Sequence, residues 1–168
     1  VLDFSAGLPD ARLFDAAAAV LGLRLKAEFE GQAAMELESL AGRRVASEIR
    51  VGLERTNGGA WIIDPLHLLA VIGSRRQRGD DLADLAADFH ASVAWMTADV
   101  IRHAAQRYGI GTVALGGGVF QNARLLASVA DRIEQRGLRV LLPRRLGPND
   151  GGISYGQAVV AAARLATL

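Results

Sequence analysis

Three consecutive glycines follow a short apolar run and precede a helical pattern, in the segment Val113-Ala-Leu-Gly-Gly-Gly-Val-Phe-Gln-Asn122. Because glycine has no Cβ, the backbone at Gly116, Gly117 and Gly118 can take positive φ and approach a ligand closely. The N–H groups of this loop, with the first unpaired N–H groups of the helix, would then point at one spot. We expect a phosphate there, and a tight turn without a ligand is the alternative.

A second glycine-bearing loop, Gly147-Pro-Asn-Asp-Gly-Gly152, also follows a predicted strand and precedes a predicted helix. In a parallel sheet both loops leave the carboxyl ends of strands, where ligands bind. We therefore expect Asp150 to face the phosphate, where a carboxylate usually acts through a metal ion. The alternative is that Asn149 and Asp150 cap the final helix. For Asn122 the alternatives are likewise a helix cap or a ligand contact.

The elements that must position these loops form a strand–helix–strand unit. Residues 112–115 and 138–142 are apolar and strand-like, and residues 123–136 carry an apolar face at helical spacing before Gly137. This order predicts a parallel βαβ unit. The segment contains neither a G-x-G-x-x-G fingerprint nor a Gly-Lys-Ser/Thr phosphate loop.

The rest of the chain is predicted to be mainly helical, with helices over residues 12–21, 32–40, 65–72 and 80–107, and a final helix ending near residue 165. Residues 43–53 and 60–63 look extended, and Asn57-Gly58-Gly59 marks a turn. Asp64 is expected to cap the helix that starts at Pro65. The longest helix carries an apolar stripe of Leu82, Leu85, Phe89, Val93, Met96, Val100 and Ala104. His90, beside this stripe, is expected to be packed or at the surface.

Composition bounds the class of protein. The 168 residues carry a formal charge of +1, which gives no electrostatic case for nucleic acid. The absence of cysteine excludes disulfides and thiolate chemistry. No apolar run is long enough for a membrane span and no signal peptide is visible, so we expect a cytoplasmic protein. The start at Val1 and the small number of strands suggest a piece of a larger domain, with further strands upstream.

Several motifs resemble those of the hydrogenase-maturation carbamoyltransferase HypF family. They run in order along the chain: Arg12 to Ala16, Glu30 to Glu36, Trp61 to Pro65, Phe89-His90, Leu115 to Leu126 and Pro148 to Ala158. The resemblance is to the C-terminal half of the large carbamoyl-transferring domain, which is related to tRNA threonylcarbamoyl-transfer enzymes. It implies a helix-rich α/β fold over residues 1–168: half of an actin-like ATPase (ribonuclease-H-like) domain with a short, mainly parallel sheet.

The resemblance also implies an activity. Members of the family use ATP and carbamoyl phosphate to form carbamoyl-adenylate, and pass the carbamoyl group to the C-terminal cysteine of a HypE-type acceptor protein. By motif, Gly116, Gly117, Gly118 and Asn122 would contact the nucleotide. Asp150 would be a ligand of a divalent metal, either iron, zinc or magnesium. The ribose and base would lie near Asp15, Gly31 and Glu36.

The sequence also departs from the family. Residues 7–11 read Gly-Leu-Pro-Asp-Ala, where members usually have small hydroxyl residues and then glycine. The histidine pair that supplies the other metal ligands is absent, and we expect it in an upstream half of the domain. Two further functions therefore remain open: a non-catalytic module that binds nucleotide or a partner, and an actin-like sugar or acid kinase.

Overall fold

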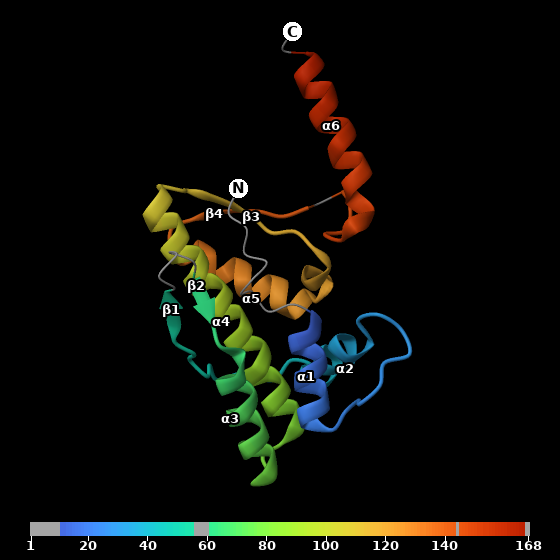
Figure 1. The fold of residues 1–168 in the computed structure, drawn as a ribbon, viewed down its shortest axis with the longest axis vertical. Coiled ribbons are helices and arrows are strands. Elements are labelled where there is room, and N and C mark those ends of the chain that lie inside the picture. Colours follow the sequence, from blue (N-terminus) through green and yellow to red (C-terminus); the bar gives the residue numbers. More distant parts are fainter. Residues whose placement is uncertain (1–10, 56–60, 144, 167–168) are drawn as a thin grey trace.

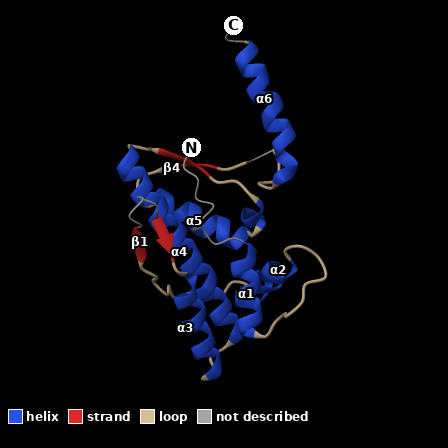
Figure 2. Cartoon of the chain, in the orientation of Figure 1, coloured by secondary structure: helices blue, strands red, loops and turns tan. Residues whose placement is uncertain are grey.

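The computed structural model describes residues 11–55, 61–143 and 145–166 (Figure 1). Most of the described chain is helical, with four short strands (Figure 2). The helices are α1 (Ala11–Leu21), α2 (Gln32–Ala41), α3 (Pro65–Gln77), α4 (Leu82–Tyr108), α5 (Ala123–Glu134) and α6 (Ile153–Leu165). Two short 3-10 turns are η1 (Gly118–Gln121) and η2 (Asp150–Gly152). The predicted turn at Asn57-Gly58-Gly59 lies outside the described residues.

The four strands form two separate pairs. Strands β1 (Leu53–Arg55) and β2 (Trp61–Ile63) are antiparallel. Strands β3 (Thr112–Ala114) and β4 (Arg139–Leu141) are parallel, with Val113 opposite Val140. Because α5 connects β3 to β4, the predicted parallel βαβ unit is confirmed, and so is the helix-rich α/β class with a short parallel sheet.

Helix α4 is the centre of the core. It packs against α2, α3 and α5, while α1 packs against α2 and α3. The Phe14 ring of α1 meets the Phe89 ring of α4 edge to face, with 5.2 Å between the ring centroids. Burial of each such side chain contributes about 1.5–3 kcal/mol to the free energy of folding. The predicted stripe is buried from Leu85 onward, whereas Leu82, the first residue of α4, is exposed.

Helix α3 is longer than predicted, because it continues through Gly73 to Gln77 instead of ending near residue 72. Gly73 does not have positive φ, and a Cβ there would lie 3.4 Å from a methyl of Val20, an ordinary contact between α3 and α1, so nothing at this glycine ends the helix. The last turn of α3 is then anchored by Arg75, which binds Asp80 at 2.7 Å and Asp88 at 2.6 Å. The predicted cap is present at the other end, where Asp64 accepts from the Leu66 N–H at 2.9 Å.

Residues 44–50 have no regular secondary structure, although they run extended beside α4. The Ser47 N–H donates to the Asp88 carboxylate at 2.6 Å, and the Ile49 N–H donates to the Ser92 hydroxyl at 2.8 Å. Asp88 and Ser92 are one helical turn apart, so they hold alternate N–H groups of the extended segment. Of residues 43–53, all predicted to be extended, only Leu53 belongs to a strand, as the first residue of β1.

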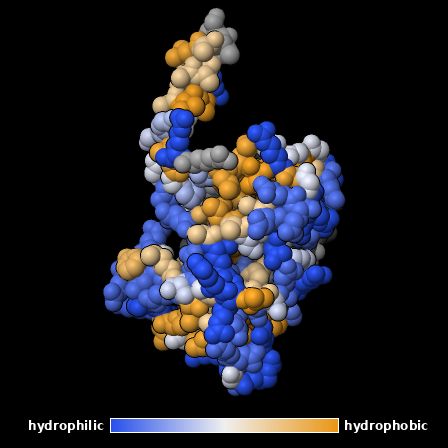
Figure 3. Space-filling view, turned by 180° about the vertical axis from the view of Figure 1, so that it is seen from behind, coloured by the Kyte–Doolittle hydropathy of each residue, from blue (hydrophilic) through white to orange (hydrophobic). Residues whose placement is uncertain are grey.

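Helix α6 differs from the others because none of its residues is buried. It extends away from the helical body (Figure 1) and carries apolar side chains along its length (Figure 3). These exposed side chains are Ile153, Tyr155, Val159, Val160 and Leu165. Within the described residues, no helix combines the length and the low polarity that crossing a bilayer requires.

Candidate functional site

The glycine loop lies directly after β3, and all three of its glycines are exposed. Gly117 has φ of +106°, a conformation that residues with a side chain rarely adopt. A Cβ at Gly116 or Gly118 would meet no atom within 4 Å, and neither residue has positive φ. Of the three loop glycines, therefore, only Gly117 has a backbone conformation that requires glycine. The backbone at Gly116 and Gly118 therefore leaves open space in which a ligand or another protein segment could bind.

The two glycine-bearing loops meet, as the sequence predicted. The Gly117 N–H donates to the Pro148 carbonyl at 2.5 Å. Asp150 follows two residues later at the start of η2, and its side chain is exposed. The loops therefore form one surface at the carboxyl ends of β3 and β4. However, the N–H group of Gly117 already has an acceptor within the chain.

The N-terminus of α5 is also partly occupied by the protein's own groups. The Asn122 side chain accepts from the Leu125 N–H at 2.8 Å, which makes it the helix cap. The Glu38 carboxylate of α2 accepts from the Arg124 N–H at 3.0 Å. The prediction that the first N–H groups of this helix point at a ligand is thus wrong for Arg124 and Leu125. An acidic side chain from α2 holds the place that an anion would take.

A buried polar contact lies beneath the glycine loop. The Asn122 amide nitrogen lies 2.9 Å from His90 Nε2, and His90 Nδ1 lies 2.7 Å from the Ala86 carbonyl oxygen. The His90 ring also packs against Phe14, with 5.6 Å between ring centroids. Only 1% of His90 is exposed. Burial lowers the pKa of the imidazole, and the positive charge of Arg124 lowers it further, against opposing effects of the Ala86 carbonyl and Glu38.

The residues expected near ribose and base lie on α1 and at α2. Asp15 is exposed, one residue after the buried Phe14. Gly31 has φ of +78° and precedes α2. Glu36 forms an ion pair with Arg24 at 2.6 Å and accepts from Gln32 at 3.3 Å. The hydrogen bond from Arg24 lowers the pKa of the Glu36 carboxyl, which is therefore an anion at neutral pH. These contacts hold the loop before α2 and do not reach the glycine loop.

Asp150 does not form a metal centre by itself. Within residues 11–55, 61–143 and 145–166, no three His, Cys, Asp or Glu side chains are grouped so that they could hold an ion. The alternative prediction, that Asn149 and Asp150 cap the final helix, is wrong, because Gly152 is the N-cap residue of α6 and no side chain caps this helix. Asn149 precedes η2 and makes no side-chain capping bond there either. The described residues thus do not form a complete metal site.

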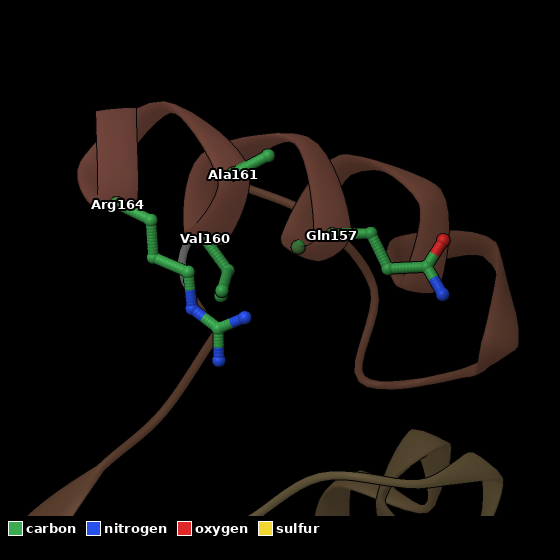
Figure 4. A pocket seen from close by; sticks show the side chains of 5 residues that line it. Gln157, Val160, Ala161 and Arg164 are labelled. Carbon is green, nitrogen blue, oxygen red and sulfur yellow. The ribbon is translucent and has the colours of Figure 1, made fainter. Parts of the chain in front are cut away.

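A surface groove lies on α6, away from the glycines of the loop. It is lined by Gly156, Gln157, Val160, Ala161 and Arg164, which all come from this helix (Figure 4). A groove on the surface of a single exposed helix encloses no ligand. The glycine loop and its neighbours remain the candidate site.

Sequence reasoning missed two residues that shape this site. Glu38 was not singled out, although it holds the start of α5. Arg124 was not singled out either, although its guanidinium donates to the carbonyls of Gly42 at 2.6 Å and Arg44 at 2.8 Å. No local sequence signal marks either contact. The burial of His90 could be expected from the stripe, but its contact with Asn122 could not.

Comparisons with known proteins identify the family of this chain. Residues 5–157 match the family described as "Carbamoyltransferase, Kae1-like Domain, second subdomain". Carbamoyltransferase HypF of Rhizobium leguminosarum bv. viciae is 41% identical over 152 residues, which cover 89% of this chain and 19% of that protein.

Two solved structures are also similar. Full-length HypF in its phosphate- and nucleotide-bound form superposes with a TM-score of 0.84 at 37% identity, covering 92% of this chain and 20% of that one. HypF of T. kodakarensis superposes with a TM-score of 0.78 at 28% identity, covering 94% and 20%. The chain thus spans about one fifth of the length of these relatives. The expected actin-like half-domain is confirmed, and the chain belongs to the HypF carbamoyltransferase family.

Proposed function

We propose that this chain forms one wall of the nucleotide site of a carbamoyltransferase. In this proposal the enzyme forms carbamoyl-adenylate from ATP and carbamoyl phosphate and passes the carbamoyl group to the C-terminal cysteine of a HypE-type acceptor in the cytoplasm. The upstream half of the domain would supply the opposite wall. Family membership and the nucleotide-bound relative support this reading.

The observation that carries the proposal is the open glycine surface beside Pro148. Gly116 and Gly118 have no backbone need for glycine, and a side chain there would meet nothing in this chain. A ligand that lies against the bare backbone accounts for both residues. Phosphate groups are the usual occupants of such loops.

The residues of this chain would then bind and orient the nucleotide. The glycine backbone would lie against its phosphates, while Asp15, Gly31 and Glu36 would lie toward its ribose and base. Asp150 would supply one ligand of a divalent metal whose other ligands come from outside this chain. Because Asn122 is engaged by Leu125 and His90, we assign it to support of the loop.

A chimera tests the proposal. The matching segment of the Rhizobium leguminosarum relative is replaced by this chain, and ATP-dependent formation of carbamoyl-adenylate from carbamoyl phosphate is measured. We expect activity, and we expect Gly118→Ala to raise the KM for ATP. Gly111→Ala is the matched control, since Gly111 is exposed at the other end of β3, has no positive φ and has equally open surroundings. A folded but inactive chimera, or equal effects of both variants, would contradict the proposal.

A further inference from the structure

His90 occupies a place in the core where any side chain of similar size would pack. Its ring lies edge to face against Phe14 and Phe89, at 5.6 Å and 5.8 Å between ring centroids. An apolar residue would satisfy those contacts without the cost of burying two polar nitrogen atoms. What the histidine adds is therefore its hydrogen bonding.

The hydrogen bonds of His90 fix its tautomer. The Ala86 carbonyl can only accept, so Nδ1 must carry the proton. In the neutral ring Nε2 is then an acceptor, and it faces the amide nitrogen of Asn122, which donates. The amide oxygen of Asn122 in turn accepts from the Leu125 N–H. Rotating the amide by half a turn would set like groups against each other, and rotating the ring would put carbon atoms in place of both nitrogens. The two residues therefore specify each other's orientation.

Three backbone hydrogen bonds, joined by the short stretches of chain between them, link Asn122 to the second loop. The Asn122 N–H donates to the Val119 carbonyl at 3.3 Å, and the Phe120 N–H donates to the Gly117 carbonyl at 3.1 Å. The Gly117 N–H donates to Pro148 at 2.5 Å. The buried side of helix α4 is thus connected through Asn122 and η1 to both glycine-bearing loops.

We infer that His90 is a positioning residue, which holds Asn122 and through it sets the placement of the glycine loop against Pro148. The inference rests on the proposed nucleotide role of that loop for its functional consequence. His90 is buried and does not touch a ligand itself. Its effect on binding passes through the contacts of Asn122, Val119, Gly117 and Pro148.

The coupling is tested on the 168-residue chain by hydrogen exchange, without any ligand. In His90→Leu we expect the Gly117 N–H to exchange about tenfold faster, the size of effect that one lost hydrogen bond gives. His90→Gln keeps an acceptor toward Asn122 and should restore most of the protection. Thr97→Val is the matched control, because Thr97 is a buried polar residue of α4 whose hydroxyl bonds only within the helix, at 2.9 Å to Val93. It should leave Gly117 unchanged.

If His90→Leu unfolds, Asn122→Ser tests the same coupling between His90 and the glycine loop. Serine can still cap α5 but is too short to reach His90. Loss of protection at Gly117 with protection kept at Leu125 supports the inference. Protection kept at both N–H groups overturns it, as does unchanged exchange at Gly117 in a folded His90→Leu.

The functional consequence is measured in the chimera. We expect His90→Leu to raise the KM for ATP roughly tenfold while kcat changes little, with His90→Gln restoring the KM. If Gly117 exchanges faster but the KM is unchanged, the coupling stands and the proposed nucleotide role of the loop is overturned. If Gly118→Ala raises the KM and a folded His90→Leu does not, the positioning role itself is overturned.

Discussion

Glu38 of α2 accepts a hydrogen bond from the backbone N–H of Arg124, at 3.0 Å, at the first turn of α5. The same arginine donates through its guanidinium to the carbonyls of Gly42 and Arg44, just beyond the end of α2. Three hydrogen bonds of Arg124 therefore join the start of α5 to this region, one to α2 itself and two to the residues that follow it. The negative charge of Glu38 also lies at the positive end of the α5 dipole.

Replacing Glu38 tests this contact. We expect Glu38→Ala to lower the free energy of unfolding by about 1 kcal/mol, the usual effect of losing a cap at a helix N-terminus. Glu38→Gln should lose less, because its amide oxygen can still accept from Arg124 without the charge. Urea denaturation of the three proteins measures the difference. Equal stability of all three would show that the contact contributes nothing.

Gly118→Ala should separate folding from binding. Alanine at this position meets no atom within 4 Å and needs no positive φ, so the melting temperature should stay unchanged. Nucleotide affinity, measured by calorimetry, should fall at least several-fold because the Cβ occupies the face that the ligand needs. Gly117→Val is a different case. Its φ of +106° adds backbone strain of about 1–2 kcal/mol, so this variant should lose stability as well.

Asp150→Ala should leave stability within about 0.5 kcal/mol, as is usual for an exposed residue without a structural role. If Asp150 is one ligand of a divalent ion, nucleotide binding by the chimera should weaken in the presence of that ion and stay the same after chelation. Titrations with and without a chelator, alongside thermal melting, make the comparison. Asn149→Ala serves as the control within the same loop. A clear loss of melting temperature in Asp150→Ala would assign the residue to structure.

His90 should make stability depend on pH in a defined direction. Burial lowers the pKa of His90 in the folded chain below its unfolded value of about 6.5. The unfolded chain therefore binds the proton first as pH falls. Stability is complete above about pH 6.5 and declines as pH falls from there toward the folded pKa. The charged groups acting on the ring are Arg124, which lowers the pKa, and Glu38, which raises it.

The contribution of His90 to this pH dependence can be measured with the variant His90→Gln, because glutamine does not titrate. Denaturant unfolding of both proteins between pH 5 and 8 should give a steeper decline for the chain with histidine. Parallel curves would mean that His90 does not contribute. His67 offers a further control, because it lies on α3 and belongs to none of the contacts described for His90.

The uncovered α6 should make the isolated chain associate with itself. Apolar side chains arranged along an exposed helix favour burial against another surface. Light scattering should show a mass that rises with concentration, and Val159→Glu with Val160→Glu should reduce it. We also expect the isolated chain to bind ATP more weakly than the chimera, because the opposite wall of the site is missing. A stable monomer with full nucleotide affinity would contradict this expectation.

Local patterns in the sequence were enough for much of the fold. The βαβ unit follows from apolar runs on either side of a helical stripe, and the cap at Asp64 follows from residue type and position. For Asn122 the cap is one of two alternatives, and the structure shows it. The meeting of the two glycine loops follows from the geometry of parallel strands. These features depend on neighbours along the chain or on one general rule of topology.

The supporting contacts of the site could not be predicted in this way. Glu38 and Arg124 are separated by 86 residues, and His90 and Asn122 by 32. Which side chain reaches which depends on how α2, α4 and α5 cross, and a single sequence does not specify these crossings. The same holds for α3, which continues through Gly73 to Gln77 and is held at its last turn by the contacts of Arg75 with Asp80 and Asp88.

The extended segment beside α4 has a consequence for the order of folding. Its N–H groups at Ser47 and Ile49 find their acceptors 41 and 43 residues later, on Asp88 and Ser92. Those acceptors lie one turn apart only after α4 has become helical. The segment therefore becomes ordered after α4, and the entropy of closing this long loop must be offset before either bond forms. Replacing Ser47 or Ile49 by proline, which removes the N–H group, should thus change the rate of unfolding and leave the rate of folding nearly unaltered.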